Sequence, residues 1–117
     1  MIHKFYGKVV DTPETIRKGL MYIKIPLQSN KGMLFNMEKL DYHSFWMKNT
    51  YIPLDVIFLN SNFRVVGYVT NNKPLSLNPI NINKKSKYIL EINAGGVQKH
   101  NIKINDYIEF YVLQPPQ

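Results

Sequence analysis

Short runs of apolar, β-branched and aromatic residues recur along the chain, and they predict strands more often than helices. KFYGKVV (4–10) alternates polar and apolar residues, as a strand with one buried face does. Further short strands are expected at MLFNM (33–37), KYILEIN (87–93) and DYIEFYVL (106–113). The pattern therefore predicts a sheet.

One stretch, DTPETIRKGLMY (11–22), predicts a helix instead. Asp11 or Thr12 suits the N-cap, and Pro13 falls in the first turn, where its missing N–H costs nothing. Ile16 would then lie on the inner face of this helix. We expect it to be the only substantial helix of the chain.

The central part of the chain predicts a meander of three strands, HSFWMK (43–48), LDVIFLN (54–60) and FRVVGYVT (63–70). If the first two are antiparallel, the connection between them places Lys48 opposite Asp55. Opposed side chains in a sheet are within reach of each other, so a cross-strand ion pair is expected. Asn60, Ser61 and Asn62 form the second turn, because Asn tolerates a positive φ.

Together these elements predict a mainly β fold with minor α (α+β), a small antiparallel β-barrel or sandwich with one N-terminal helix. A short helical turn at AGGVQKHN (94–101) should precede the last strand. Residues 1–113 are expected to form a single domain, and the proline-containing tail 114–117 should be exposed.

Composition excludes several classes of site. The chain has no Cys, so disulfides and thiolate chemistry are excluded, and the three His show no metal-ligand spacing. We expect neither a metal nor a cofactor. No apolar run is long enough to span a membrane and no signal peptide is visible, which favours a cytoplasmic or intracellular protein, or a component of a virion or other particle.

The net charge of +7 comes from 13 Lys and only two Arg, and much of this bias is compatible with AT-rich coding. Four lysines form a candidate basic surface around the longest loop: Lys73, Lys84, Lys85 and Lys87. Its alternatives are a solvated loop or a surface that contacts phosphates. Non-specific nucleic-acid binding is not favoured, because Arg is scarce and no aromatic ladder accompanies the lysines.

An alternative to the structural ion pair is a ligand pocket, in which a few polar groups meet at the mouth of an apolar cavity. Its candidate residues are Arg17, Trp46, Lys48, Asn49, Thr50, Asp55 and Glu91. We expect Trp46 to be shielded from solvent, with Met47 on the opposite face of the strand. Glu91 pairs either with a Lys or with Asp55, as the acid and base of a hydrolase.

Six segments resemble, in order, a widespread family of uncharacterised proteins, domain of unknown function 192. They are RKGLMY, KGMLF, FWMKNTYIPLDVIFLN, VVGYV, YILEINAGG and IKINDYIEF, between Lys8 and Phe110. The resemblance implies a compact, β-rich, barrel-like fold and no established activity. Asn105 stands where the family usually has Gly, and because Asn is the next-best residue for a left-handed backbone, the turn should persist.

These observations favour a non-enzymatic binding or accessory module whose ligand the sequence does not name, with no catalytic residue assigned. One alternative is a small basic interaction or structural component of a larger assembly, with a protein partner. The other is a hydrolase-like enzyme that acts on a carbohydrate or a phosphorylated substrate through Asp55 and Glu91.

Overall fold

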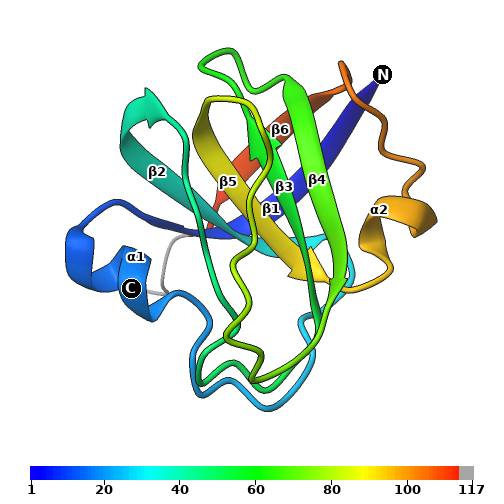
Figure 1. Cartoon of the computed structure of the whole chain (residues 1–117). Coiled ribbons are helices and arrows are strands. Elements are labelled where there is room, and N and C mark those ends of the chain that lie inside the picture. The colour runs from blue at the N-terminus through cyan, green and yellow to red at the C-terminus, as the bar shows by residue number, and fades with distance from the viewer. Residues whose placement is uncertain (114–117) are drawn as a thin grey trace.

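A six-stranded sheet organises residues 1–113, the part of the chain that the computed structural model describes (Figure 1). The predicted tail 114–117 lies outside these residues. The elements follow one another as β1 (Ile2–Val10), α1 (Pro13–Lys18), β2 (Lys31–Asp41), β3 (Leu54–Leu59), β4 (Val65–Asn72), β5 (Ser86–Asn93), α2 (Gly96–Lys99) and β6 (Tyr107–Val112). The predicted mainly β fold with minor α is confirmed.

The sheet is mixed, with strand order β4-β3-β5-β2-β1-β6. The pairs β3–β4, β3–β5 and β2–β5 are antiparallel, as predicted. However, β1 is parallel to both β2 and β6. This part departs from the antiparallel expectation because the connection through α1 brings the chain back to start β2 at the same end as β1.

The sheet curls until its two outer strands meet at one end. Arg64, just before β4, forms an antiparallel bridge with Tyr107 of β6. The N–H of Val65 donates to the carbonyl oxygen of Asp106 at 2.8 Å, and the N–H of Asn105 donates to that of Val65 at 2.8 Å. Asn105 has a φ of 79°, so the left-handed turn expected there is confirmed. The result is a half-barrel.

Two hydrophobic clusters lie on the two faces of this sheet. The inner cluster contains Phe5, Ile57, Leu90 and Ile108, and the residues at the closing seam pack against it. The outer cluster contains Leu20, Phe35, Met47, Leu54, Val56, Phe58, Ile80 and Ile89. Alternate residues of β3 and β5 belong to alternate clusters, so both strands are buried on both faces.

The predicted three-strand meander is wrong in its first strand. Residues 43–48 are outside the sheet, apart from a bridge between Phe45 and Ile80. Both edges of β3 are already occupied by β4 and β5, so no edge remains for another strand. The β3–β4 hairpin itself is confirmed, although the positive φ of its turn falls on Phe63 at 62° and not on an Asn.

The two predicted helical segments are present. Thr12 is the N-cap of α1, its side chain accepts from the N–H of Thr15, and Pro13 begins the helix. The helix ends before Gly19, whose φ of 47° turns the chain, and is therefore shorter than the predicted 11–22. Neither helix is long and apolar enough to cross a membrane.

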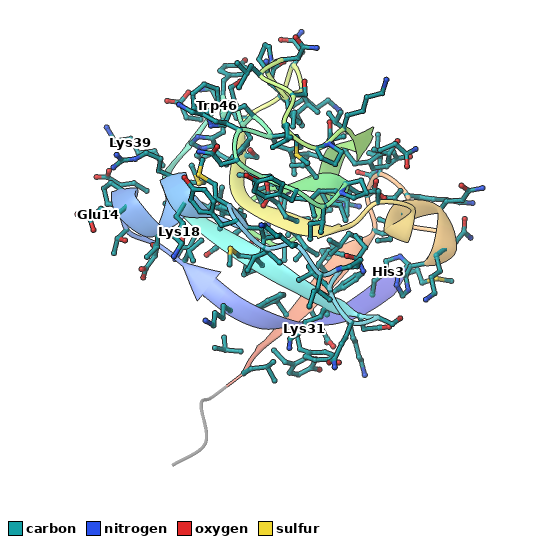
Figure 2. All side chains as sticks on the ribbon, turned by 90° about the horizontal axis from the view of Figure 1, so that it is seen from below. His3, Glu14, Lys18, Lys31, Lys39 and Trp46 are labelled. Atoms are coloured by element: carbon teal, nitrogen blue, oxygen red, sulfur yellow. The ribbon has the colours of Figure 1, made fainter. Side chains whose placement is uncertain are left out.

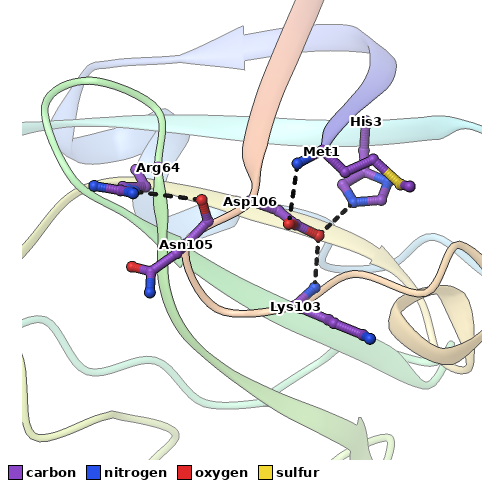
Figure 3. Close-up of polar contacts among 6 residues, drawn as sticks. All are labelled: Met1, His3, Arg64, Lys103, Asn105 and Asp106. Atoms are coloured by element: carbon purple, nitrogen blue, oxygen red, sulfur yellow. Dashed lines mark hydrogen bonds and ion pairs between the residues drawn. The ribbon is translucent and has the colours of Figure 1, made fainter.

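Asp106 ties the start of the chain to the turn before β6 (Figure 3). Its carboxylate contacts Nε2 of His3 at 2.8 Å and accepts from the N–H of Lys103 at 2.9 Å and from the terminal amine of Met1 at 3.3 Å. Hydrogen bonding to His3, followed by that to Lys103, lowers the pKa of Asp106 to about 2. The anionic form therefore stabilises this seam.

Replacing Asp106 with Asn should lower stability at neutral pH and have little effect near pH 2. The folded-state pKa of Asp106 lies below its ordinary value of 3.8. The stabilisation is therefore complete above that value and is lost as the pH falls toward about 2. Urea unfolding followed across this range, with Asp11→Asn as an exposed control, measures the difference. Equal destabilisation at both ends of the range would contradict an ionic contribution.

Candidate functional site

A cavity of about 210 Å³ lies on the outer face of the sheet, between the end of α1 and residues 44–50. Glu91 of β5 lines it from the sheet side, together with Phe35 of β2. Arg17 and Trp46 also line it and are exposed to solvent, which places them at its mouth. The cavity thus combines an apolar wall, a buried acid and a cationic rim.

The turn after α1 shapes one side of the cavity. A side chain at Gly19 would bring its Cβ to 3.1 Å from the ring of Phe35, so glycine allows the turn to pack closely on β2. Leu20, the next residue, is buried in the outer cluster. This anchoring leaves the last residues of α1, Arg17 and Lys18, at the cavity mouth.

The opposite side is formed by residues that were expected to be a strand. The ring of Phe45 packs edge-on against Phe35, with centroids 5.6 Å apart, and Met47 is buried. Trp46 points the other way, as expected from its position between them, but it is 46% exposed (Figure 2). The prediction of a shielded Trp46 is therefore wrong, because this segment carries no strand layer over its outer side.

Glu91 is the buried acid of the cavity, with 6% of its surface exposed. Its neighbours in the sheet register are Met33 and Val56, both apolar. Among residues 1–113, no side chain or N–H forms a hydrogen bond or ion pair with its carboxyl group, so the predicted Lys partner is wrong. Burial raises the pKa of Glu91 to about 8, and the carboxyl is mostly protonated at neutral pH.

Asp55 lies on the other face of the sheet and belongs to no cavity with Glu91. It is fully buried, and its two oxygens accept from the N–H of Asn71 at 2.8 Å and the N–H of Val97 at 2.9 Å. It therefore holds the end of β4 and the start of α2. The predicted pairs of Asp55 with Lys48 and with Glu91 are both wrong, since these side chains do not meet.

The remaining predicted residues have separate roles. The ammonium of Lys48 lies 5.0 Å from the centre of the Trp46 ring, outside the cavity lining. Asn49 has a φ of 55° and binds Tyr22, accepting from its N–H and donating to its hydroxyl. Thr50 lines the cavity.

Four of the seven predicted residues thus share the cavity: Arg17, Trp46, Thr50 and Glu91. Sequence reasoning missed Lys18, Ser44 and Phe45, which line it as well. Lys18 adjoins Arg17 in the sequence, and this adjacency was the available signal. Nothing local indicated Ser44 or Phe45, because the strand expected there does not form.

The four lysines of the predicted basic surface do not act as one group. Lys87 donates to the side-chain oxygen of Asn36 at 2.7 Å and to the carbonyl oxygen of Met37, so it joins β5 to β2. Lys85 lies 5.9 Å from the ring of Tyr42. Lys73 and Lys84 are exposed. In residues 1–113, no three His, Asp or Glu side chains lie close enough together to hold a metal ion.

Comparison with known proteins gives a family and two related structures. The profile of the family DUF192, described as "Uncharacterized ACR", matches residues 2–110. The crystal structure of a "putative transcription regulator" from Sinorhizobium meliloti 1021 is 31% identical, with a TM-score of 0.81 over 85% of this chain and 76% of that one. A protein of unknown function from Novosphingobium aromaticivorans DSM 12444 is 33% identical, with a TM-score of 0.80 over 85% and 70%. No curated protein matches the chain.

Asp55→Ala should destabilise the protein by ~2–5 kcal/mol, because it leaves two buried N–H groups without an acceptor. Lys48→Ala should change stability by no more than ~0.5 kcal/mol, since its ammonium contacts only the exposed face of Trp46. The double variant should equal the sum of the two, as expected for side chains that do not touch. Chemical denaturation of the three variants measures this. A coupling energy above ~1 kcal/mol would show that Lys48 and Asp55 interact and would contradict this assignment.

Glu91→Gln should stabilise the protein by an amount that grows with pH. The pKa of Glu91 is raised from 4.5 to about 8, so the folded protein holds this proton more tightly than the unfolded chain. The contribution of Glu91 to the free energy of unfolding of wild type is complete below pH 4.5. It is lost as the pH rises through about 8, and the loss is at most ~5 kcal/mol. Urea midpoints of both proteins should separate between about pH 5 and pH 9. A constant difference would contradict the burial of Glu91.

Proposed function

We propose that this chain, which belongs to the DUF192 family of uncharacterised proteins, is a non-enzymatic binding module that holds a small polar molecule in the cavity beside α1. The observation that carries the proposal is Glu91. Its largely buried carboxyl group has no hydrogen-bond or ion-pair partner among residues 1–113 and stands at the inner side of a cavity that opens to solvent.

Burial of Glu91 without a partner among residues 1–113 is costly to the fold, although its carboxyl oxygens keep some contact with the cavity. Removing a polar group from water without a compensating hydrogen bond costs ~1–3 kcal/mol in proteins. An apolar residue at this position would pack with its neighbours Met33 and Val56 and would avoid the cost. A carboxyl group therefore fits this position best when a ligand supplies the missing hydrogen-bond or charge partner.

The rest of the cavity has the composition of a ligand site. Such sites combine apolar and aromatic walls with a few convergent polar groups. Here the walls include Phe35 and Phe45, and the polar groups are Thr50, Glu91 and the cations at the mouth. Binding accounts for this arrangement without a reaction, because Glu91 has no second carboxyl group beside it to serve as an acid–base partner.

A second candidate is a component of a larger assembly with a protein partner, and the exposure of Trp46 favours it. Further apolar side chains are exposed on the loops that follow α1 and on those around residues 51 and 75–77: Tyr22, Ile23, Ile25, Tyr51, Leu75 and Leu77. Hydrogen bonds from Tyr22 and Leu75 to the backbone of Asn49 and Thr50 hold these loops together. Large aromatic side chains of this kind anchor protein interfaces.

Trp46 provides a direct test, because it is the sole Trp of the chain and stands at the cavity mouth. A metabolite library screened by thermal shift and Trp fluorescence should yield a ligand that changes both signals. Ser44→Phe, which fills part of the cavity, should weaken its binding at least about tenfold, a loss of ~1.4 kcal/mol. Ser61→Phe, on the β3–β4 turn, is the matched control and should bind normally.

Two outcomes would contradict a binding cavity. One is a complete library that changes neither signal. The other is a ligand whose affinity is the same for wild type and Ser44→Phe. If wild type binds no small molecule but Trp46→Ala abolishes capture of a defined protein partner, the assembly component becomes the better account.

A further inference from the structure

We infer that the ligand is amphoteric and of amino-acid size, with an ammonium group that pairs with Glu91 inside the cavity and an anionic group that meets Arg17 and Lys18 at its mouth. This inference rests on the proposed function of the cavity. It adds the chemical class of the ligand and the direction in which the ligand enters.

The inner end of the cavity calls for a cation. Glu91 is the one carboxyl group of its lining, and it makes no ion pair within the described chain. An ammonium group brings both a positive charge and three hydrogen-bond donors, which a buried carboxylate can accept. Pairing the two charges in this way offsets the cost of removing each of them from water.

The walls favour the same orientation. Aromatic rings present a negative face, which attracts cations and repels anions. Phe35, Phe45 and Trp46 all line the cavity. The Lys48 ammonium already lies 5.0 Å from the centre of the Trp46 ring, so a cation is accommodated at this ring in the free protein.

The mouth has the opposite preference. Arg17 and Lys18 form the basic last turn of α1, both are exposed, and neither belongs to an ion pair within residues 1–113. Glu91 is buried at the sheet side of the cavity, whereas the two cations are exposed and form no ion pair with it. The two signs of charge therefore lie at separate ends of the cavity, and a guanidinium at the mouth suits a carboxylate or phosphate.

The volume limits the part of a ligand that fits inside the cavity, which opens to solvent at its mouth. A cavity of about 210 Å³ equals the share of roughly seven water molecules in the liquid. A molecule with an ammonium, a carboxylate and a chain of two to five carbons occupies such a volume. Larger nucleotides or oligosaccharides would extend far beyond it.

Affinity should depend on pH in a direction that identifies the charge of the ligand. The other charged side chains that line the cavity are Arg17 and Lys18, and the neighbours of Glu91 on β2 and β3 are the apolar Met33 and Val56. An ammonium binds the ionised form of Glu91, so affinity should rise as the pH approaches about 8. It should fall again near pH ~10, where alkyl amines lose their proton. A ligand bound through its anionic group alone would instead lose affinity as the pH rises toward about 8, because Glu91 then becomes negatively charged.

The test uses three probes of matched length: 4-aminobutanoate, butylamine and butanoate. Calorimetry and Trp46 fluorescence should give the strongest binding for 4-aminobutanoate, about tenfold weaker binding for butylamine and none for butanoate. Glu91→Gln should lower the affinity for both amines at least about tenfold. The double variant Arg17→Gln/Lys18→Gln should reduce 4-aminobutanoate to the level of butylamine and leave butylamine unchanged.

Controls separate these effects from misfolding and from general charge. Circular dichroism and Trp emission should be the same for each variant and wild type. Lys84→Gln/Lys103→Gln removes two exposed cations away from the cavity and should leave all three affinities unchanged.

Butanoate binding as tightly as butylamine, or affinity for the amines that falls between about pH 6 and pH 8, would overturn the inference. So would the failure of all three probes. In either case a library compound that loses affinity in Ser44→Phe would still support the binding cavity. Failure of the probes and of the library together would remove both proposals.

Discussion

Burial of β3 and β5 on both faces is the constraint on which the rest of the structure depends. All six residues of β3 are buried, and its side chains alternate between the inner and outer clusters. A strand of this kind must be covered by side chains on both sides. The curl of the sheet covers the inner face, and α1 with the long loops covers the outer one (Figure 1).

The outer cover consists of short pieces, and the cavity lies where two of them meet. The helix α1 has only six residues, and the segment that faces it across the cavity is not part of the sheet. Leu20 anchors one piece and Met47 the other, both in the same cluster. A longer helix, or a strand at residues 43–48, covering this face would close the space that Glu91 now lines.

The two acids of the central strands are accommodated in different ways. Asp55 receives two backbone N–H donors, from Asn71 and Val97, and thereby joins distant segments. Glu91 receives none from the described part of the chain and has a raised pKa beside a cavity. Neighbouring strands thus carry one carboxylate that the fold uses for its own stability and one carboxyl group that is available to a ligand. Their separation on opposite faces excludes cooperation between them.

Local signals in the sequence determined most of the elements: the strands other than the one expected at 43–48, the Thr12 cap of α1 and the left-handed backbone at Asn105. They act within a few residues, so one sequence contains them fully. The tertiary structure decided which strands are neighbours, and this choice assigned Asp55 and Glu91 to opposite faces and left Trp46 exposed. Pairing of β3 with β5 joins residues that are 29 to 39 positions apart. No periodicity encodes such a contact, because it depends on which edge remains free once the whole chain has folded.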